Sequence, residues 1–153
     1  MTKTITLANA AIISITNYFT SEDYWQNHND SVSGSISWIF RKNKKELSKA
    51  LELIKEAETE LNEEYNTDEK SQFAKDDNGN DTEDKIVKPE YAEEYLNKKV
   101  ELYNQTQDIK IDFIKPDDLM NYNLKDIDWD MMEFMITEED EEESTEDDTE
   151  AEE

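Results

Sequence analysis

The chain has 153 residues and a formal net charge of −25, from 41 acidic and 16 basic residues. Only 35% of it is hydrophobic, so we expect one small domain with a modest core. The negative charge disfavours direct binding to DNA, RNA or an anionic membrane, because all three carry the same sign. Cysteine is absent, which excludes disulfides and thiolate metal sites.

The N-terminal part predicts a short strand around Thr4–Leu7 and then a helix. Apolar residues follow the strand at three- and four-residue spacing, which is typical of one helical face. These residues are Ile12, Ile15 and Phe19. Residues 20–34 are rich in Ser, Asn and Asp and predict a loop. We expect Tyr24 and Trp25 in this loop to be exposed anchors of a partner interface, where aromatic side chains concentrate binding energy.

Residues 37–65 predict a long helix with one apolar seam. Its apolar residues are spaced by seven, four, three, seven and four positions, as in a coiled coil or a helical hairpin. They are Phe40, Leu47, Leu51, Ile54, Leu61 and Tyr65. One seam cannot be buried alone, so the helix needs either a partner helix or a second copy of the protein. The second alternative would make a homodimer.

Residues 66–88 break this pattern and predict a polar loop or a small β-hairpin, because Asn78-Gly79 is a strong turn signal. Pro89 suits the first turn of a returning helix, where its missing N–H is not needed. The residues expected to pack the returning helix against the long one are Tyr91, Tyr95, Leu102 and either Leu96 or Val100. The two helices together predict an antiparallel helical hairpin at about 36–104.

Residues 108–114 alternate between polar and apolar, which predicts a half-buried strand. A turn and a short helical element follow. The segment 137–153 holds twelve acidic residues and no basic one, so residues 1–136 carry a net charge of −13. This composition predicts a disordered tail. The fold class expected is therefore α+β, mainly α, with a single domain at 1–136.

The order of these segments resembles a family of small phage and prophage proteins of unknown function from low-GC Gram-positive bacteria. The resemblance rests on an "ITL" start, a helix opening "WIFRKNKKEL", a "DDNGN" tip, a returning "EYAEEYLNKKVEL" and a closing "MMEFMI". It covers roughly residues 3–136, and the loop at 20–34 and the acidic tail depart from the family's pattern. It implies a phage-type protein in the cytoplasm of a bacterial host and carries over no active site.

No pattern predicts a catalytic, metal or cofactor site, so we expect a protein that is not an enzyme. His28 is the only histidine, and no nucleophile motif accompanies it. The "DDNGN" segment is similar to a calcium loop, but Ala74 and Lys85 stand where that motif needs carboxylates. Carboxylates at 117–118 and 126–130 leave a metal-dependent enzyme as a third alternative, although basic groups to hold phosphates are missing there.

The long helix carries the one basic cluster, formed by Arg41, Lys42, Lys44 and Lys45. Two interpretations remain open for it. The cluster docks an acidic partner or RNA, or it neutralises the protein's own acids, which is the simpler interpretation.

Four acids further along the same helix are spaced so that they line up on one face: Glu52, Glu56, Glu60 and Glu63.

We expect a non-enzymatic accessory protein that binds a phage or host protein with a basic surface. The alternative is an acidic inhibitor of a host nucleic-acid-dependent defence enzyme, such as a CRISPR or restriction nuclease. Such an inhibitor would act by nucleic-acid mimicry or by covering the enzyme's surface.

Overall fold

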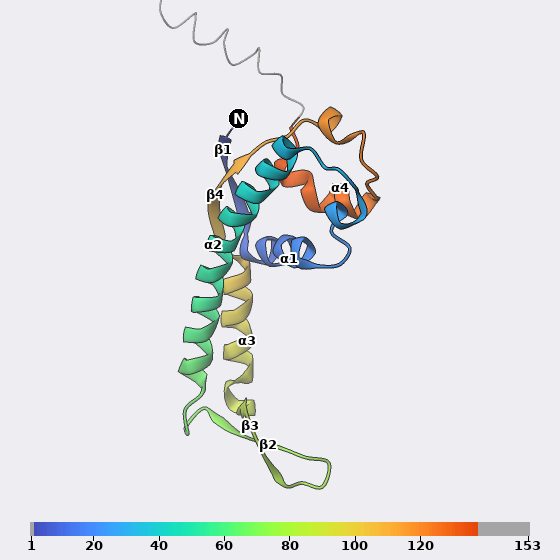
Figure 1. The fold of residues 1–153 in the computed structure, drawn as a ribbon. Coiled ribbons are helices and arrows are strands. Elements are labelled where there is room, and N and C mark those ends of the chain that lie inside the picture. Colours follow the sequence, from blue (N-terminus) through green and yellow to red (C-terminus); the bar gives the residue numbers. More distant parts are fainter. Residues whose placement is uncertain (1, 138–153) are drawn as a thin grey trace, which may run out of the picture.

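The computed structural model describes residues 2–137, which form an α+β fold that is mainly helical (Figure 1). In chain order the elements are β1 (Thr2–Ala8), α1 (Asn9–Thr20), α2 (Gly34–Tyr65), β2 (Ser71–Lys75), β3 (Asp81–Val87), α3 (Pro89–Asn104), β4 (Thr106–Asp112) and α4 (Asp126–Met132). Short 3₁₀ turns lie at Trp25–His28, Pro116–Leu119 and Glu133–Met135. The predicted fold class is confirmed at this level.

The strands β1 and β4 form a two-stranded antiparallel sheet, with Ile5 opposite Ile109 and Thr2 opposite Asp112. Ile109 and Ile111 are buried while Lys110 between them is exposed, so the predicted alternation is confirmed for these residues. The sheet joins segments that are about a hundred residues apart in sequence. Residue periodicity does not encode that pairing.

The helix α2 runs from the C-terminal elements to the β2–β3 hairpin and carries the predicted apolar seam (Figure 1). Phe40, Leu47 and Ile54 are at most 2% exposed, which confirms the seam. The elements that cover it are α1, β4 and α3 of the same chain. Elements of the same chain therefore bury the seam, so the seam is not open to a second copy of the protein.

The two aromatic residues of the loop 20–34 are buried, so the prediction that they are exposed anchors is wrong. Trp25 is 1% exposed and Tyr24 is 4% exposed. The ring of Trp25 lies 5.2 Å from that of Phe40 and 5.2 Å from that of Tyr122. The cause is the 3₁₀ turn at Trp25–His28, which directs these rings onto the N-terminal half of α2, where burial of their large area stabilises the core.

The helix α3 starts at Pro89, as predicted, and lies beside the C-terminal half of α2 (Figure 1). Leu102 packs inward as expected, but Leu96 is 58% exposed and Val100 is 56% exposed. The prediction that one of those two would pack is wrong, because both point to the other side of the helix. Polar contacts take their place: Tyr103 Oη donates to Glu58 at 2.9 Å, and Lys98 Nζ donates to Glu64 at 2.7 Å.

The strands β2 and β3 form the β-hairpin predicted between the long helices (Figure 1). Gly79 at its tip has φ +82°, a conformation that L side chains rarely adopt. The turn signal at Asn78-Gly79 is therefore confirmed.

The C-terminal elements pack back onto α1. Ile114 forms a parallel bridge with Ile136, and the Tyr18 hydroxyl donates to the buried carboxylate of Asp128. The predicted tail lies outside the described residues except for Thr137. No helix within residues 2–137 is both long and apolar enough to cross a membrane.

Candidate functional site

The face of α2 opposite the buried seam is a continuous exposed surface. Its residues are three or four positions apart, so they lie one above another along one side of the helix. From the N-terminal end they are Trp38, Arg41, Lys45, Lys49, Glu52, Glu56, Glu60 and Glu63, and all are exposed. We call these eight residues the outer stripe. All four predicted acids and two of the four predicted cations lie on it.

Charge is segregated along the outer stripe, with cations in its first half and acids in its second. Residues four apart therefore carry the same sign, as with Lys45 and Lys49 or Glu52 and Glu56, and such pairs destabilise an isolated helix. The order also opposes the helix dipole, since α2 has no acid in its first turn and no base in its last turn. Helix stability therefore does not explain this arrangement.

The structure divides the predicted basic cluster into two pairs. Lys42 forms an ion pair with Asp112 of β4, and its hydrogen bond holds the pKa of that carboxyl below its usual range. The ammonium of Lys44 lies 4.8 Å from the centre of the Tyr24 ring, and burial lowers the pKa of Lys44. These two cations stabilise the fold from within, as the internal interpretation predicts for Lys42.

Arg41 and Lys45 are exposed and form no ion pair with any residue of the described part of the chain. Both line an open groove of about 680 Å³ between α2 and the β1–β4 sheet, together with Trp38 and Lys110. The groove also holds Lys42 and two carboxylates, Glu46 and Asp112. The outer stripe therefore begins in a basic hollow.

Trp38 is 57% exposed, although Trp25 and Trp129 are largely packed. Trp38 is not among the candidate site residues predicted from the sequence. The signal was present, because position 38 is one helical turn from Arg41 and two from Lys45, on the polar side of the helix. An exposed indole beside cations is typical of a contact surface, where Trp and Arg are enriched.

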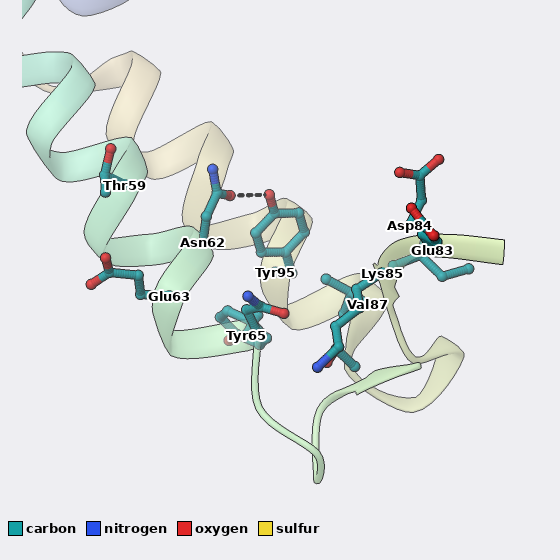
Figure 2. Close-up of a pocket in the computed structure, with 12 residues that line it drawn as sticks. Thr59, Asn62, Glu63, Tyr65, Glu83, Asp84, Lys85, Val87 and Tyr95 are labelled. Carbon is teal, nitrogen blue, oxygen red and sulfur yellow. Dashed lines mark hydrogen bonds between the residues drawn. The ribbon is translucent and has the colours of Figure 1, made fainter. Parts of the chain in front are cut away.

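A second hollow, of about 610 Å³, lies where the far end of α2 meets β3 and α3 (Figure 2). Figure 2 shows Thr59, Asn62, Glu63 and Tyr65 from α2 around it, with Tyr95 from α3 donating a hydrogen bond to Asn62. The β3 residues at its rim include Glu83, Asp84 and Lys85. Glu63 is thus shared by this acidic hollow and the end of the outer stripe.

The Tyr65 ring packs at the base of this hollow between two cations. Lys70 Nζ lies 5.0 Å and Lys98 Nζ lies 5.2 Å from the ring centre. The hydrogen bond from Lys98 lowers the pKa of the Glu64 carboxyl, and that pair raises the pKa of Lys98. These cations are held by the protein itself, so the hollow presents acids to its surroundings.

The candidate site consists of segregated surface charge and one exposed indole. Among residues 2–137 no three His, Cys, Asp or Glu side chains gather as a metal ion would require. His28 is exposed, and its Nε2 lies 2.9 Å from the Glu22 carbonyl oxygen within the same loop.

The chain matches no protein-family model, no curated protein and no solved structure.

Proposed function

We propose that this is a non-enzymatic binding protein that acts through protein–protein contact along the outer stripe. The segregation of charge on that stripe, beginning at the exposed Trp38, supports the proposal most directly. Like charges four residues apart repel one another in the free protein. A partner that places acids against the cations and cations against the acids relieves this repulsion, and Trp38 supplies apolar area to the same contact.

The resemblance to phage and prophage proteins supports a phage-type accessory role in the cytoplasm of a bacterial host. In this proposal α2 and α3 act as an antiparallel helical hairpin that holds the stripe straight. The partner is a phage or host protein. Its surface is basic where it meets Glu52–Glu63 and acidic where it meets Arg41–Lys49.

A pull-down from a lysate of a low-GC Gram-positive bacterium tests this function. The full chain is the bait, and Lys45→Glu and Glu56→Lys each reverse one charge on the stripe. Lys75→Glu and Glu93→Lys make the same changes of charge at exposed positions in β2 and α3. We expect a captured protein that both stripe variants lose and both controls retain. Equal capture by all five baits would refute the proposal.

The alternative function is inhibition of a host nucleic-acid-dependent enzyme. One observation favours it: Glu52, Glu56 and Glu60 are fixed on a rigid helix and separated by about 6 Å of rise each. A regular row of anions at such spacing resembles a phosphate backbone in sign and order. This function predicts that added DNA or RNA releases the captured protein, whereas the main proposal predicts that the complex survives.

A further inference from the structure

We infer that the partner which fits the outer stripe most closely is a second copy of this chain, with its α2 antiparallel to the first. The inference rests on the proposed function in that it takes the stripe to be a contact surface. It concerns the exposed face of α2 and not the apolar seam, which the chain covers itself.

The register follows from the order of charges. A twofold axis between Ala50 and Leu51 places residues at equal distances from that point opposite each other. Three charge pairs then meet across the interface: Lys49 with Glu52, Lys45 with Glu56, and Arg41 with Glu60. Each pair occurs twice by symmetry, so these three pairs give six contacts between opposite charges.

The same register also gives compatible pairs for the residues at the edges of the stripe. Lys55 lies opposite Glu46, again with opposite sign, and Leu53, which is 59% exposed, lies opposite Ser48. Trp38 of each copy meets Glu63, the residue at which the stripe reaches the acidic hollow. Sliding one helix by three residues in either direction would place Glu52 opposite Glu52 or Lys49 opposite Lys49, so the charges disfavour those registers. A parallel arrangement would place every charge beside its own copy, so the charges favour the antiparallel direction.

The net charge of the protein sets the conditions for association. Two chains of net charge −25 repel each other, but this repulsion is screened beyond about 8 Å at physiological ionic strength. Ion pairs in direct contact act within that distance and weaken only as salt rises further. We therefore expect dimerisation to be strongest near about 0.15 M salt and to fall at both lower and higher ionic strength.

Sedimentation equilibrium of the full chain tests the inference. Lys45→Glu places two acids opposite each other twice, and Glu56→Lys does the same with two cations. Each variant alone should raise the dimer dissociation constant at least about tenfold. An equimolar mixture of the two restores every contact in a heterodimer, and the double variant restores every contact in its own homodimer. Both should return to within about threefold of the original value.

The controls Lys75→Glu and Glu93→Lys change the net charge equally but lie off the stripe, so they should leave the constant unchanged. Helical circular dichroism confirms that each variant is folded. A monomer at every concentration, or equal effects of stripe and control variants, would overturn the inference. If the chain is monomeric while the stripe variants still lose a lysate protein, the proposed function stands and only the self-association fails. If the mixture of variants restores the dimer while no lysate protein is captured, the self-association stands and the binding of a lysate protein fails.

Discussion

Asn43 of α2 and Asp112 of β4 bind each other in both directions. The Asn43 side-chain amide donates to the Asp112 carbonyl oxygen at 2.9 Å, and the Asp112 backbone N–H donates to Asn43 Oδ1 at 2.9 Å. Asn43 is 1% exposed, so water does not replace either bond. One polar side chain in the apolar seam therefore fixes the sheet against the long helix.

Asn43→Ala should lower the free energy of unfolding by about 2 kcal/mol, because the partly buried N–H and C=O groups of Asp112 both lose their partner. Urea denaturation followed by circular dichroism measures the change. Asn97→Ala, at an exposed position of α3, is the control and should change stability by less than about 0.5 kcal/mol. Equal effects at the two positions would show that the Asn43 bonds do not stabilise the sheet.

The Lys42–Asp112 ion pair predicts a particular pH dependence. The pKa of Asp112 is depressed in the fold, first by the hydrogen bond from Lys42 and then by that from Thr2. Its contribution to stability is therefore complete above the ordinary Asp pKa, and it disappears as the pH falls through the depressed pKa. Lys42→Met should cost about 1 kcal/mol at pH 7 and progressively less below about pH 4.

Chemical denaturation of the wild type and of Lys42→Met at a series of pH values gives this difference directly. Lys85→Met serves as the control, since Lys85 lies off the outer stripe and pairs with Asp68 in an exposed contact of 4.0 Å. We expect a smaller cost for the control at pH 7. A cost for Lys42→Met that stays constant down to pH 2 would contradict the assignment to Asp112.

The buried pair Tyr18 and Asp128 attaches the C-terminal segment to α1. Asp128 is 2% exposed, and its second oxygen accepts a 2.7 Å hydrogen bond from the Lys125 N–H. Burial, and then the hydrogen bond to Asp128, raise the pKa of the Tyr18 hydroxyl, which stays protonated and donates. Tyr18→Phe should cost about 2 kcal/mol, because it removes a donor from a buried carboxylate.

Tyr103→Phe provides the comparison for Tyr18→Phe. Tyr103 donates to Glu58 at 2.9 Å, but that contact is only half-buried. Loss of this hydrogen bond should lower the free energy of unfolding by about 0.5 kcal/mol. Urea denaturation measures the change for both Tyr18→Phe and Tyr103→Phe. If the two variants lose equal stability, burial of Asp128 is not what makes its partner important.

Local signals in the sequence were sufficient for most of the secondary structure. The seam from Phe40 to Tyr65, the alternation around Ile109 and the turn at Asn78-Gly79 each depend on residues close in the chain. The failures concern burial, which depends on elements far away in sequence. Tyr24 and Trp25 stand in a polar stretch, yet the N-terminal half of α2 buries them.

The candidate site was predicted in part for the same reason. Glu52 and Glu56 belong to an exposed face that helical spacing reveals without any tertiary information. The sequence does not show which cations are used internally, because Asp112 and Tyr24, the partners of Lys42 and Lys44, come from other elements. Trp38 was missed because composition favours burial of tryptophan, whereas its position on the helix indicates exposure.

The two glycines of the chain differ in backbone conformation and provide a matched pair of substitutions. Gly79 has φ +82°, whereas Gly34 starts α2 with a conformation open to any residue, and neither has an atom within 4 Å of an added Cβ. Gly79→Ala should destabilise the β2–β3 hairpin by about 1 kcal/mol, because alanine is strained at positive φ. Gly34→Ala should leave the protein equally or slightly more stable, since it restricts the unfolded chain.

Amide hydrogen exchange separates a local effect on the hairpin from an effect on the whole protein. The hairpin amides of Gly79→Ala should exchange faster while those of α2 stay protected, and unchanged hairpin exchange would mean that its tip tolerates a side chain.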